Sequence, residues 1–259
     1  MTPIERAAYL MHVETAAYRR QLSEATELIE RHHDHVVSTS WGKDSMVLLH
    51  LAASVIHEVQ AINARYPNPA ERFADMDRVR DAMLSRPDMA HIRYTEVPTP
   101  GEWCMYERAG GGFSEAVTKQ QREAARWWKS NFSANMNAAM ERVGGAGVML
   151  GLRAEESHAR RLNLATHGTY YERKDGMHVV LPLSRWTGRD VWAYMVAHDL
   201  PRLRIYDECS CTRERARSGF VFATGGAGAI RRHGVWDDWR RVYRAEFAAW
   251  VRRFPELDK

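Results

Sequence analysis

Six consecutive residues follow a short apolar stretch and combine the backbone freedom and side chains that phosphate binding needs: Ser40, Trp41, Gly42, Lys43, Asp44 and Ser45. Gly42 permits a tight turn and the close approach of an anion to the backbone. If a helix begins here, its first N–H groups and its dipole favour negative charge. Lys43 adds a positive charge, and the two serines add hydroxyl donors. The stretch therefore predicts a loop that binds phosphate groups.

The spacing excludes the commonest loop of this kind. A Walker loop has the form G-x-x-x-x-G-K-[ST]. Here Val37 stands where the first glycine would be, and Asp44 follows Lys43 in place of serine or threonine. Because both requirements fail, a Walker-type ATPase or kinase is not expected.

Strands and helices are predicted to alternate around this loop. Apolar stretches predict strands at residues 36–40, 59–66, 90–98, 146–157 and 177–186. Helical spacing predicts helices within residues 3–33, 44–57, 67–85, 114–143 and 187–200. This alternation is typical of an α/β fold with a doubly wound, mostly parallel sheet flanked by helices, in which ligands bind at the carboxyl ends of the strands. Thr187 is the expected N-cap of the last of these helices.

Length and composition fit one large α/β domain with helical extensions. The chain has 259 residues, of which 45% are hydrophobic and 27% charged. We expect an N-terminal helical extension at 1–33, a nucleotide-binding domain at 34–210, and a C-terminal loop and helical extension at 211–259 that packs on it. Residues 230–259 predict an amphipathic helix rich in Trp and Arg. Packing is favoured for this helix over a partner-protein or nucleic-acid surface.

Charge and hydropathy narrow the class of protein. The net charge of +4 and the pI of about 9.0 suit phosphate-bearing ligands, including nucleic acid, although a generally arginine-rich composition explains them equally well. No stretch is apolar over the roughly 20 residues that a membrane-spanning helix needs. The N-terminus lacks the apolar segment of a secretory signal. We therefore expect a cytoplasmic protein with no membrane contact, and the sequence leaves a homo-oligomer open.

Cysteines are few. Cys104, Cys209 and Cys211 are too few for a disulfide framework or for the full set of thiolates that an iron–sulfur cluster needs, so no such cluster is expected. Cys209 and Cys211 are candidates for a redox pair or for metal ligands. The simpler interpretation, two ordinary loop thiols, is favoured.

Three motifs together resemble one known group. The loop S-W-G-K-D-S resembles the PP-loop of the adenine nucleotide α-hydrolase superfamily. The segments G-L-R-A-E-E-S-H-A-R-R (151–161) and L-P-L-S-R-W-T-G-R-D-V-W-A-Y (181–194) are similar to motifs of its phosphoadenosine phosphosulfate (PAPS) reductase branch. The resemblance covers roughly residues 35–210. It implies the adenine nucleotide α-hydrolase-like fold and an adenine nucleotide, ATP or PAPS, as ligand.

The resemblance also implies roles for single residues. The loop residues 40–45 would hold phosphates, together with Arg153 and Arg160, since a guanidinium can clamp a phosphate with two hydrogen bonds. Lys43 and Arg153 would be catalytic, while a surface charge is an equally good interpretation of Arg160. Asp44 and Glu155 are candidates for holding Mg²⁺, although two carboxylates alone are weak evidence for a metal site.

The sequence departs from the family pattern where cysteines are concerned. PAPS reductases resemble one another in a C-terminal segment with a nucleophilic cysteine, and this chain has no cysteine after Cys211. Some relatives carry R-S-G-C-x-x-C, but here Phe220 stands at the first cysteine position. The family's second strand often ends in an Asp-Thr-Gly-like turn. Its replacement here leaves Asn63 as a nucleotide contact suggested by position only.

Three functions follow as hypotheses. The preferred one is an enzyme that cleaves ATP at the α-phosphate, releases pyrophosphate and adenylylates an unknown acceptor, in nucleic acid or sulfur modification. The second is a PAPS or adenylylsulfate reductase that releases sulfite through a cysteine thiolate. The third is a nucleotide-binding regulatory protein without turnover, of the kind found in phage or mobile elements.

Overall fold

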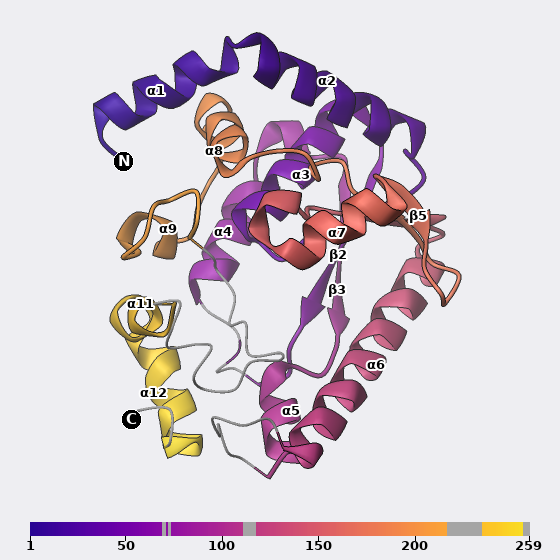
Figure 1. Ribbon diagram of the computed structural model, residues 1–259, viewed down its shortest axis with the longest axis vertical. Coiled ribbons are helices and arrows are strands. Elements are labelled where there is room, and N and C mark those ends of the chain that lie inside the picture. Colours follow the sequence, from indigo (N-terminus) through magenta and orange to yellow (C-terminus); the bar gives the residue numbers. More distant parts are fainter. Residues whose placement is uncertain (69–70, 72–73, 111–117, 217–234, 256–259) are drawn as a thin grey trace. The chain divides into compact units, whose positions relative to one another are not determined.

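The computed structural model describes residues 1–68, 71, 74–110, 118–216 and 235–255. Figure 1 shows the helices and strands of the chain, which divides into two compact units, each built from three segments. Unit 1 consists of Met1–Asn63, Val79–Glu96 and Ala139–Arg202. Unit 2 consists of Ala64–Arg78, Val97–Ala138 and Leu203–Lys259. The predicted division into 1–33, 34–210 and 211–259 stays a prediction.

The sheet has six strands in the order β3-β2-β1-β4-β6-β5. The strands are β1 (Val36–Ser38), β2 (Val59–Arg65), β3 (Ile92–Pro98), β4 (Gly147–Leu150), β5 (Tyr170–Glu172) and β6 (His178–Val180). β1 pairs in parallel with β2 and β4, β4 pairs in parallel with β6, and β5 runs antiparallel to β6. The predicted α/β fold with a mostly parallel sheet is therefore confirmed. Burial of Val36 and Val37 agrees with a central parallel strand covered on both faces.

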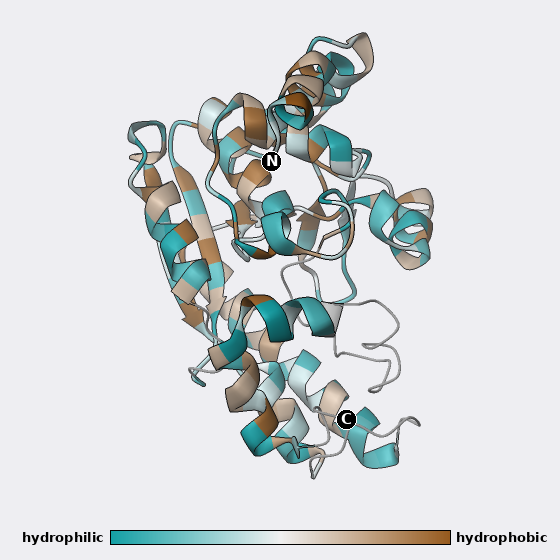
Figure 2. Cartoon of the chain, turned by 90° about the vertical axis from the view of Figure 1, so that its left-hand side faces the viewer, coloured by the Kyte–Doolittle hydropathy of each residue, from teal (hydrophilic) through white to brown (hydrophobic). Residues whose placement is uncertain are grey.

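Helices connect and flank these strands, and hydrophobic and hydrophilic residues alternate along them (Figure 2). The α-helices are α1 (Pro3–Val13), α2 (Ala16–Arg31), α3 (Lys43–Val55), α4 (Ala74–Leu84), α5 (Glu102–Arg108), α6 (Lys119–Arg142), α7 (His158–His167), α8 (Gly188–Ala197), α9 (Ile205–Glu208), α11 (Val235–Val242) and α12 (Arg244–Arg253). The described residues also form the 3₁₀ turns η2 (Pro87–Met89) and η3 (Ala154–Glu156). No helix within the described ranges is long and apolar enough to cross a membrane.

The N-terminal helices belong to the core of unit 1. α1 packs on α8, α2 packs on α3, and α3 packs on α8. The Trp186 indole donates from Nε1 to the Gln21 carbonyl at 3.3 Å, and the rings of Tyr9 and Trp192 lie 6.3 Å apart. Both tryptophans are at most 1% exposed. Their burial stabilises the unit by removing large apolar surface from water.

The start of α8 also anchors α1. Thr187 is its N-cap, as predicted: Thr187 Oγ1 accepts from the Asp190 N–H at 3.2 Å, and Asp190 Oδ2 accepts from the Thr187 N–H at 2.6 Å. This reciprocal pair is a capping box. The other Asp190 oxygen, Oδ1, contacts His12 Nε2 at 2.7 Å. The Asp190 carboxylate therefore takes part in the cap of α8 and also contacts His12 of α1, which is distant in the sequence.

Several predicted elements of unit 1 differ in extent, among them the strand predicted over 177–186, which spans only His178–Val180. The helix predicted within 3–33 is two helices, because Thr15 Oγ1 accepts from the Tyr18 N–H at 3.3 Å and begins α2 anew. The strand predicted over 146–157 ends at Leu150, since the chain then turns and the Ala154 N–H donates to the Ser184 carbonyl at 2.8 Å. The short antiparallel β5 was not predicted from the sequence.

The C-terminal tail forms two helices rather than one, α11 and α12, which meet at Tyr243. Trp239 and Trp250 are at most 1% exposed, and the Trp103 ring lies edge-on 4.9 Å from Trp250. These tail tryptophans are therefore core residues of unit 2. Phe220 and the rest of residues 217–234 lie outside the described residues.

Replacing Asp190 with alanine should lower the free energy of unfolding by about 1–3 kcal/mol, because it removes one half of the capping box of α8 and the contact with the part-buried His12. Chemical denaturation measures the decrease. The matched control is Glu5→Ala, at the same position of the exposed capping box of α1, where the decrease should be about 0.5 kcal/mol. Equal decreases in the two variants would contradict the anchoring of His12 by Asp190.

Candidate functional site

The predicted phosphate-binding loop joins β1 to α3, and its turn depends on Trp41. This residue has a φ of 57°, in the left-handed region that side chains rarely adopt. Its indole is 2% exposed and meets the ring of Tyr94 edge-on at 5.3 Å. Backbone strain of this kind costs on the order of 1 kcal/mol, and burial of a large aromatic ring offsets it. Trp41 therefore anchors the loop in its turned conformation.

Hydrogen bonds connect the two serines of the loop with each other and with the turn between them. Ser45 Oγ donates to the Gly42 carbonyl at 3.1 Å and accepts from the Ser40 N–H at 3.0 Å. The two hydroxyl oxygens lie 3.2 Å apart. Ser45 is buried and Ser40 is exposed. Ser45 thus braces the loop from inside, and Ser40 presents its side chain at the surface.

Two further residues fix the end of β1. Thr39 Oγ1 accepts from the Trp41 N–H at 3.3 Å, and Asn63 Nδ2 donates to the Thr39 carbonyl at 2.6 Å. Sequence reasoning missed Thr39, since a lone threonine before the motif carries no signal. It proposed Asn63 as a nucleotide contact, and in the structure the Asn63 amide holds the strand that leads into the loop.

Asp44 lies between two buried cations. Lys43 Nζ donates to Asp44 Oδ2 at 3.1 Å, and Arg153 Nε donates to Asp44 Oδ1 at 2.6 Å. The side chains of both cations are only 2% exposed. Burial raises the pKa of the Asp44 carboxyl, but the charges of Lys43 and Arg153 outweigh it and hold that pKa below its ordinary value. Asp44 is therefore a carboxylate at neutral pH.

Arg153 continues these contacts to the next elements. Its Nη1 donates to Glu155 Oε2 at 2.6 Å, and the same oxygen accepts from the Gly188 N–H at 2.6 Å. Its Nη2 lies 3.9 Å from a Glu156 oxygen. The guanidinium thus joins the first turn of α3, the turn after β4 and the start of α8. In this arrangement its nitrogens face carboxylates of the protein.

Arg160 is the last member of a connected set of positively and negatively charged side chains around the loop. It lies on α7, pairs with Glu156, and its side chain is 34% exposed. We call the following six side chains the loop charge network: Lys43, Asp44, Arg153, Glu155, Glu156 and Arg160. Three cations and three carboxylates make it neutral. The structure therefore brings both predicted arginines into one network with the loop lysine.

Gly151 is a residue whose role only the structure reveals. A Cβ at this position would lie 2.9 Å from the Asp44 carbonyl oxygen and 3.0 Å from the Ser45 nitrogen. Such distances are too short for a side-chain carbon against backbone atoms. Glycine is required here because β4 ends directly against the first turn of α3. That close approach is what brings Arg153 within reach of Asp44.

The arrangement does not fit the predicted Mg²⁺ site at Asp44 and Glu155. Both carboxylates direct oxygens at the guanidinium of Arg153, which lies between them. A cation held by both would have to displace that guanidinium. No group of three or more potential metal ligands forms a site within the described part of the chain. We therefore assign no chemical step to a metal at these two residues.

The candidate redox cysteines lie in unit 2. Cys209 Sγ donates to the Cys211 carbonyl at 3.1 Å, and Asp238 accepts from the backbone of Ser210 between them at 2.8 Å. Burial, followed by Cys211 and the Asp238 charge, raises the pKa of Cys209 to about 11. Burial and the charge of Glu71 also raise the pKa of Cys104. Both thiols are therefore protonated at neutral pH, the less nucleophilic state.

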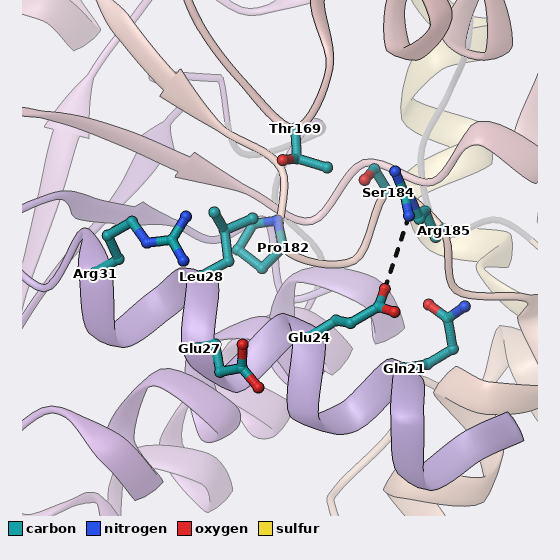
Figure 3. A pocket seen from close by; sticks show the side chains of 9 residues that line it. All are labelled: Gln21, Glu24, Glu27, Leu28, Arg31, Thr169, Pro182, Ser184 and Arg185. Atoms are coloured by element: carbon teal, nitrogen blue, oxygen red, sulfur yellow. Dashed lines mark ion pairs between the residues drawn. The ribbon is translucent and has the colours of Figure 1, made fainter. Parts of the chain in front are cut away.

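A pocket of about 250 Å³ opens elsewhere in unit 1, between α2 and the segment after β6 (Figure 3). Leu28 and Pro182 are among its lining residues, and Arg185, which also lines it, pairs with Glu24 at 3.8 Å. None of its lining residues belongs to the loop or to the loop charge network. The pocket is thus separate from the predicted phosphate site.

A mostly parallel sheet with a glycine-containing loop between β1 and the start of a helix, backed by buried cations, is an arrangement typical of nucleotide-binding α/β proteins. The chain belongs to the phosphoadenosine phosphosulfate reductase domain family, whose model matches residues 34–225. The predicted membership of the PAPS reductase-like branch is therefore confirmed.

Relatives and a solved structure agree with this assignment. The chain is 24% identical over 205 residues to a phosphoadenosine 5'-phosphosulfate reductase of Xylella fastidiosa (strain 9a5c), covering 76% of this chain and 77% of the relative. It is 26% identical over 177 residues to a protein of the same name from Synechococcus sp., covering 67% and 69%. The phosphate complex of a PAPS reductase from Candida auris has the same fold, with a TM-score of 0.50, 13% identity and coverage of 80% and 92%.

Asp44→Asn should lower the free energy of unfolding by about 3 kcal/mol at pH 7, because the buried cations Lys43 and Arg153 lose the negative charge that lies between them. The folded pKa of Asp44 is lowered, so its carboxylate stabilises the protein above the ordinary pKa of about 4 and ceases to do so as the pH falls through the folded value. The difference between the two proteins should therefore shrink below about pH 4. Denaturation at several pH values measures it.

Asp81→Asn is the matched control, since Asp81 pairs with Arg80 at the surface with 65% of its side chain exposed. Its free energy of unfolding should stay within about 1 kcal/mol of the unsubstituted protein. A decrease in Asp44→Asn no larger than in this control would contradict the bridging role of Asp44.

Alkylation of Cys209 should be slow at neutral pH and should accelerate as the pH rises toward about 11, because only the thiolate reacts. Mass spectrometry of peptides after timed exposure to iodoacetamide measures the rate at Cys209. Rapid alkylation of this thiol at pH 7 would show a depressed pKa and contradict the environment described here.

Proposed function

We propose that the protein binds an adenine nucleotide through its phosphates at the N-terminus of α3 and cleaves ATP between the α- and β-phosphates. The observation that carries the proposal is the form of this helix start. Gly42 is the N-cap of α3 and has no side chain to cap the helix, and Lys43 is the first residue of the helix. A phosphate would supply the missing acceptor and would meet the positive end of the helix dipole.

The reaction is an adenylyl transfer. A nucleophilic oxygen of the acceptor attacks the α-phosphorus, the bond to the bridging oxygen breaks, and pyrophosphate leaves with the negative charge. The loop amides and Lys43 stabilise that developing charge, and they do so strongly because Lys43 is shielded from water. Lys43 is therefore the catalytic residue of this proposal.

Arg153 acts in this scheme as a positioning residue. Its guanidinium holds the Asp44 carboxylate, and Asp44 holds Lys43. The side chain is buried and meets three carboxylates of the protein, so its contribution to phosphate binding passes through Lys43. Arg160 is more exposed, and it is the arginine of the network that a ligand reaches with least rearrangement.

The second candidate is reduction of PAPS, which membership of the family and the names of the two curated relatives favour. In this reaction a thiolate attacks the sulfur of the sulfate group, the bond from sulfur to the phosphate oxygen breaks, and a second thiol releases sulfite by forming a disulfide. The protonated state of Cys209 at neutral pH speaks against that thiolate. For this reason the adenylyl transfer stands first.

Incubation with ATP labelled at the α-phosphate should yield labelled AMP or a labelled acceptor together with unlabelled pyrophosphate. Lys43→Ala should reduce the rate by about 100-fold or more, since it removes the charge nearest the leaving group. Lys174→Ala, an exposed lysine in the turn between β5 and β6, is the matched control and should keep full activity. Calorimetry and circular dichroism show whether Lys43→Ala still binds the nucleotide and folds.

Nucleotide binding without any pyrophosphate from a range of acceptors would contradict the enzymatic proposal and favour a binding protein. Sulfite release from PAPS with a thiol reductant, abolished on replacing Cys209 or Cys211 with serine, would instead establish the second candidate. The two readouts use different substrates, so one outcome does not mask the other.

A further inference from the structure

The pocket between α2 and the segment after β6 takes no part in the proposed function, and hydrogen bonds hold both of its walls in place. The Trp186 indole donates from Nε1 to the Gln21 carbonyl at 3.3 Å and so ties one wall to the other. In the second wall the Leu181 N–H donates to the Thr169 carbonyl at 2.8 Å, and the Ser184 N–H donates to the Leu181 carbonyl at 3.1 Å. The pocket is therefore formed before any ligand arrives, as binding sites for small molecules usually are.

The size of the pocket limits what can fill it. Its volume of about 250 Å³ lies below the roughly 300–1,000 Å³ of sites for drug-sized molecules. At about 30 Å³ for each water-sized group, it holds about eight such groups. An amino acid has this size, whereas a nucleotide is much larger. The pocket therefore suits a small metabolite and not the nucleotide proposed for the loop.

Charged side chains of both signs line the pocket (Figure 3). α2 contributes Glu24, Glu27 and Arg31, and Arg185 follows β6. Arg185 Nη1 lies 3.8 Å from Glu24 Oε2, which is beyond hydrogen-bond distance. Among the described residues no carboxylate lies within ion-pair distance of Arg31, although Glu27 stands four positions before it on the helix. Two carboxylates and two guanidinium groups thus leave the pocket neutral and incompletely paired.

A buried hydroxyl and two apolar side chains complete the lining. Ser184 is 2% exposed, and its Oγ has no hydrogen-bond partner among the described residues. Most buried hydroxyl groups in native proteins are hydrogen-bonded, so a partner for Ser184 is expected from a ligand or a water molecule in the pocket. Leu28 and Pro182 offer apolar surface. The pocket thus combines charged groups with a small apolar area, as specific small-molecule sites do.

We propose that this pocket binds a free α-amino acid with an aliphatic side chain. Such a molecule carries an ammonium group and a carboxylate on one carbon atom, so its charges cancel as those of the pocket do. Residues four apart on a helix have Cβ atoms about 6 Å apart, so the ammonium group can meet Glu27 while the carboxylate meets Arg31 with two hydrogen bonds. The aliphatic side chain then packs on Leu28 and Pro182.

Two simpler classes of ligand fit the pocket less well. A carboxylic acid without an amino group would pair with Arg31 but would bring negative charge next to Glu24 and Glu27. An amine without a carboxylate would pair with a glutamate and would leave Arg31 without a counter-charge. A ligand with both groups satisfies both sides. The proposal concerns unit 1 alone and does not depend on the reaction proposed for the loop.

The test uses the full chain and isothermal titration calorimetry with leucine, valine and methionine in turn. At least one of them should bind. Its N-acetyl derivative and the amine that lacks its carboxylate should each bind at least about tenfold more weakly, because each loses one charge-assisted contact. Arg31→Gln should also weaken binding at least about tenfold. The matched control is Arg19→Gln, which removes the same charge from an exposed position of α2 outside the pocket and should keep the affinity within about twofold.

Glu27→Gln separates recognition of the ammonium group from a general loss of the pocket. It should reduce the preference for the amino acid over its N-acetyl derivative at least about fivefold, since that derivative has no ammonium group to recognise. A damaged pocket would instead weaken both ligands equally and keep the preference. Glu27 and Arg31 are exposed, and circular dichroism checks that both variants fold.

Three results would overturn the proposal: no binding of any of the three amino acids at millimolar concentration, equal weakening by Arg31→Gln and Arg19→Gln, or an analogue that binds as tightly as the amino acid. The last would indicate a simple carboxylate or a simple amine as the ligand. Selective weakening in the two pocket variants, with a preference for the amino acid over both analogues, would establish it.

Discussion

The carboxylate of Asp44, set between Lys43 and Arg153, is the interaction on which the candidate site depends. Each of its oxygens accepts from one buried cation. Two cations this deeply buried would repel each other more strongly if the carboxylate were not between them. The pairing therefore decides whether the first turn of α3 and the turn after β4 can meet at all. Gly151 makes the same meeting sterically possible.

The neutrality of the loop charge network has a consequence for ligand binding. A phosphate that arrives at Gly42 brings negative charge next to a lysine that already has a counter-ion. It must therefore compete with Asp44 for Lys43, and the energy of that exchange is the difference between two ion pairs rather than a full new one. Under the proposed function, this exchange would favour anions that also accept hydrogen bonds from the loop amides.

The sequence predicted those features that depend on residues close together in the chain, such as the loop, the mostly parallel sheet and the cap at the start of α8. Contacts between distant residues were not predictable: the hydrogen bond from Asn63 to Thr39 joins segments whose approach only the fold determines. The surroundings of the tryptophans were equally unpredictable, because an amphipathic pattern indicates an apolar face of a helix but not the residues that cover it. In the tail Trp250 meets Trp103, whereas on α6 Trp127 meets a guanidinium and keeps part of its ring in water.

Family membership establishes the fold more firmly than the reaction, because a fold can host several chemistries. A reductase of this family needs a sulfur nucleophile, and a nucleophilic thiolate arises next to cations or at a helix N-terminus. Cys209 has the opposite surroundings: it is half-buried and close to the carboxylate of Asp238. Lys43, by contrast, is a buried cation at the start of a helix, the environment that stabilises phosphate charge. Cys209 is thus a weak nucleophile in this arrangement, whereas the start of α3 suits the binding of phosphate, which both proposed reactions require.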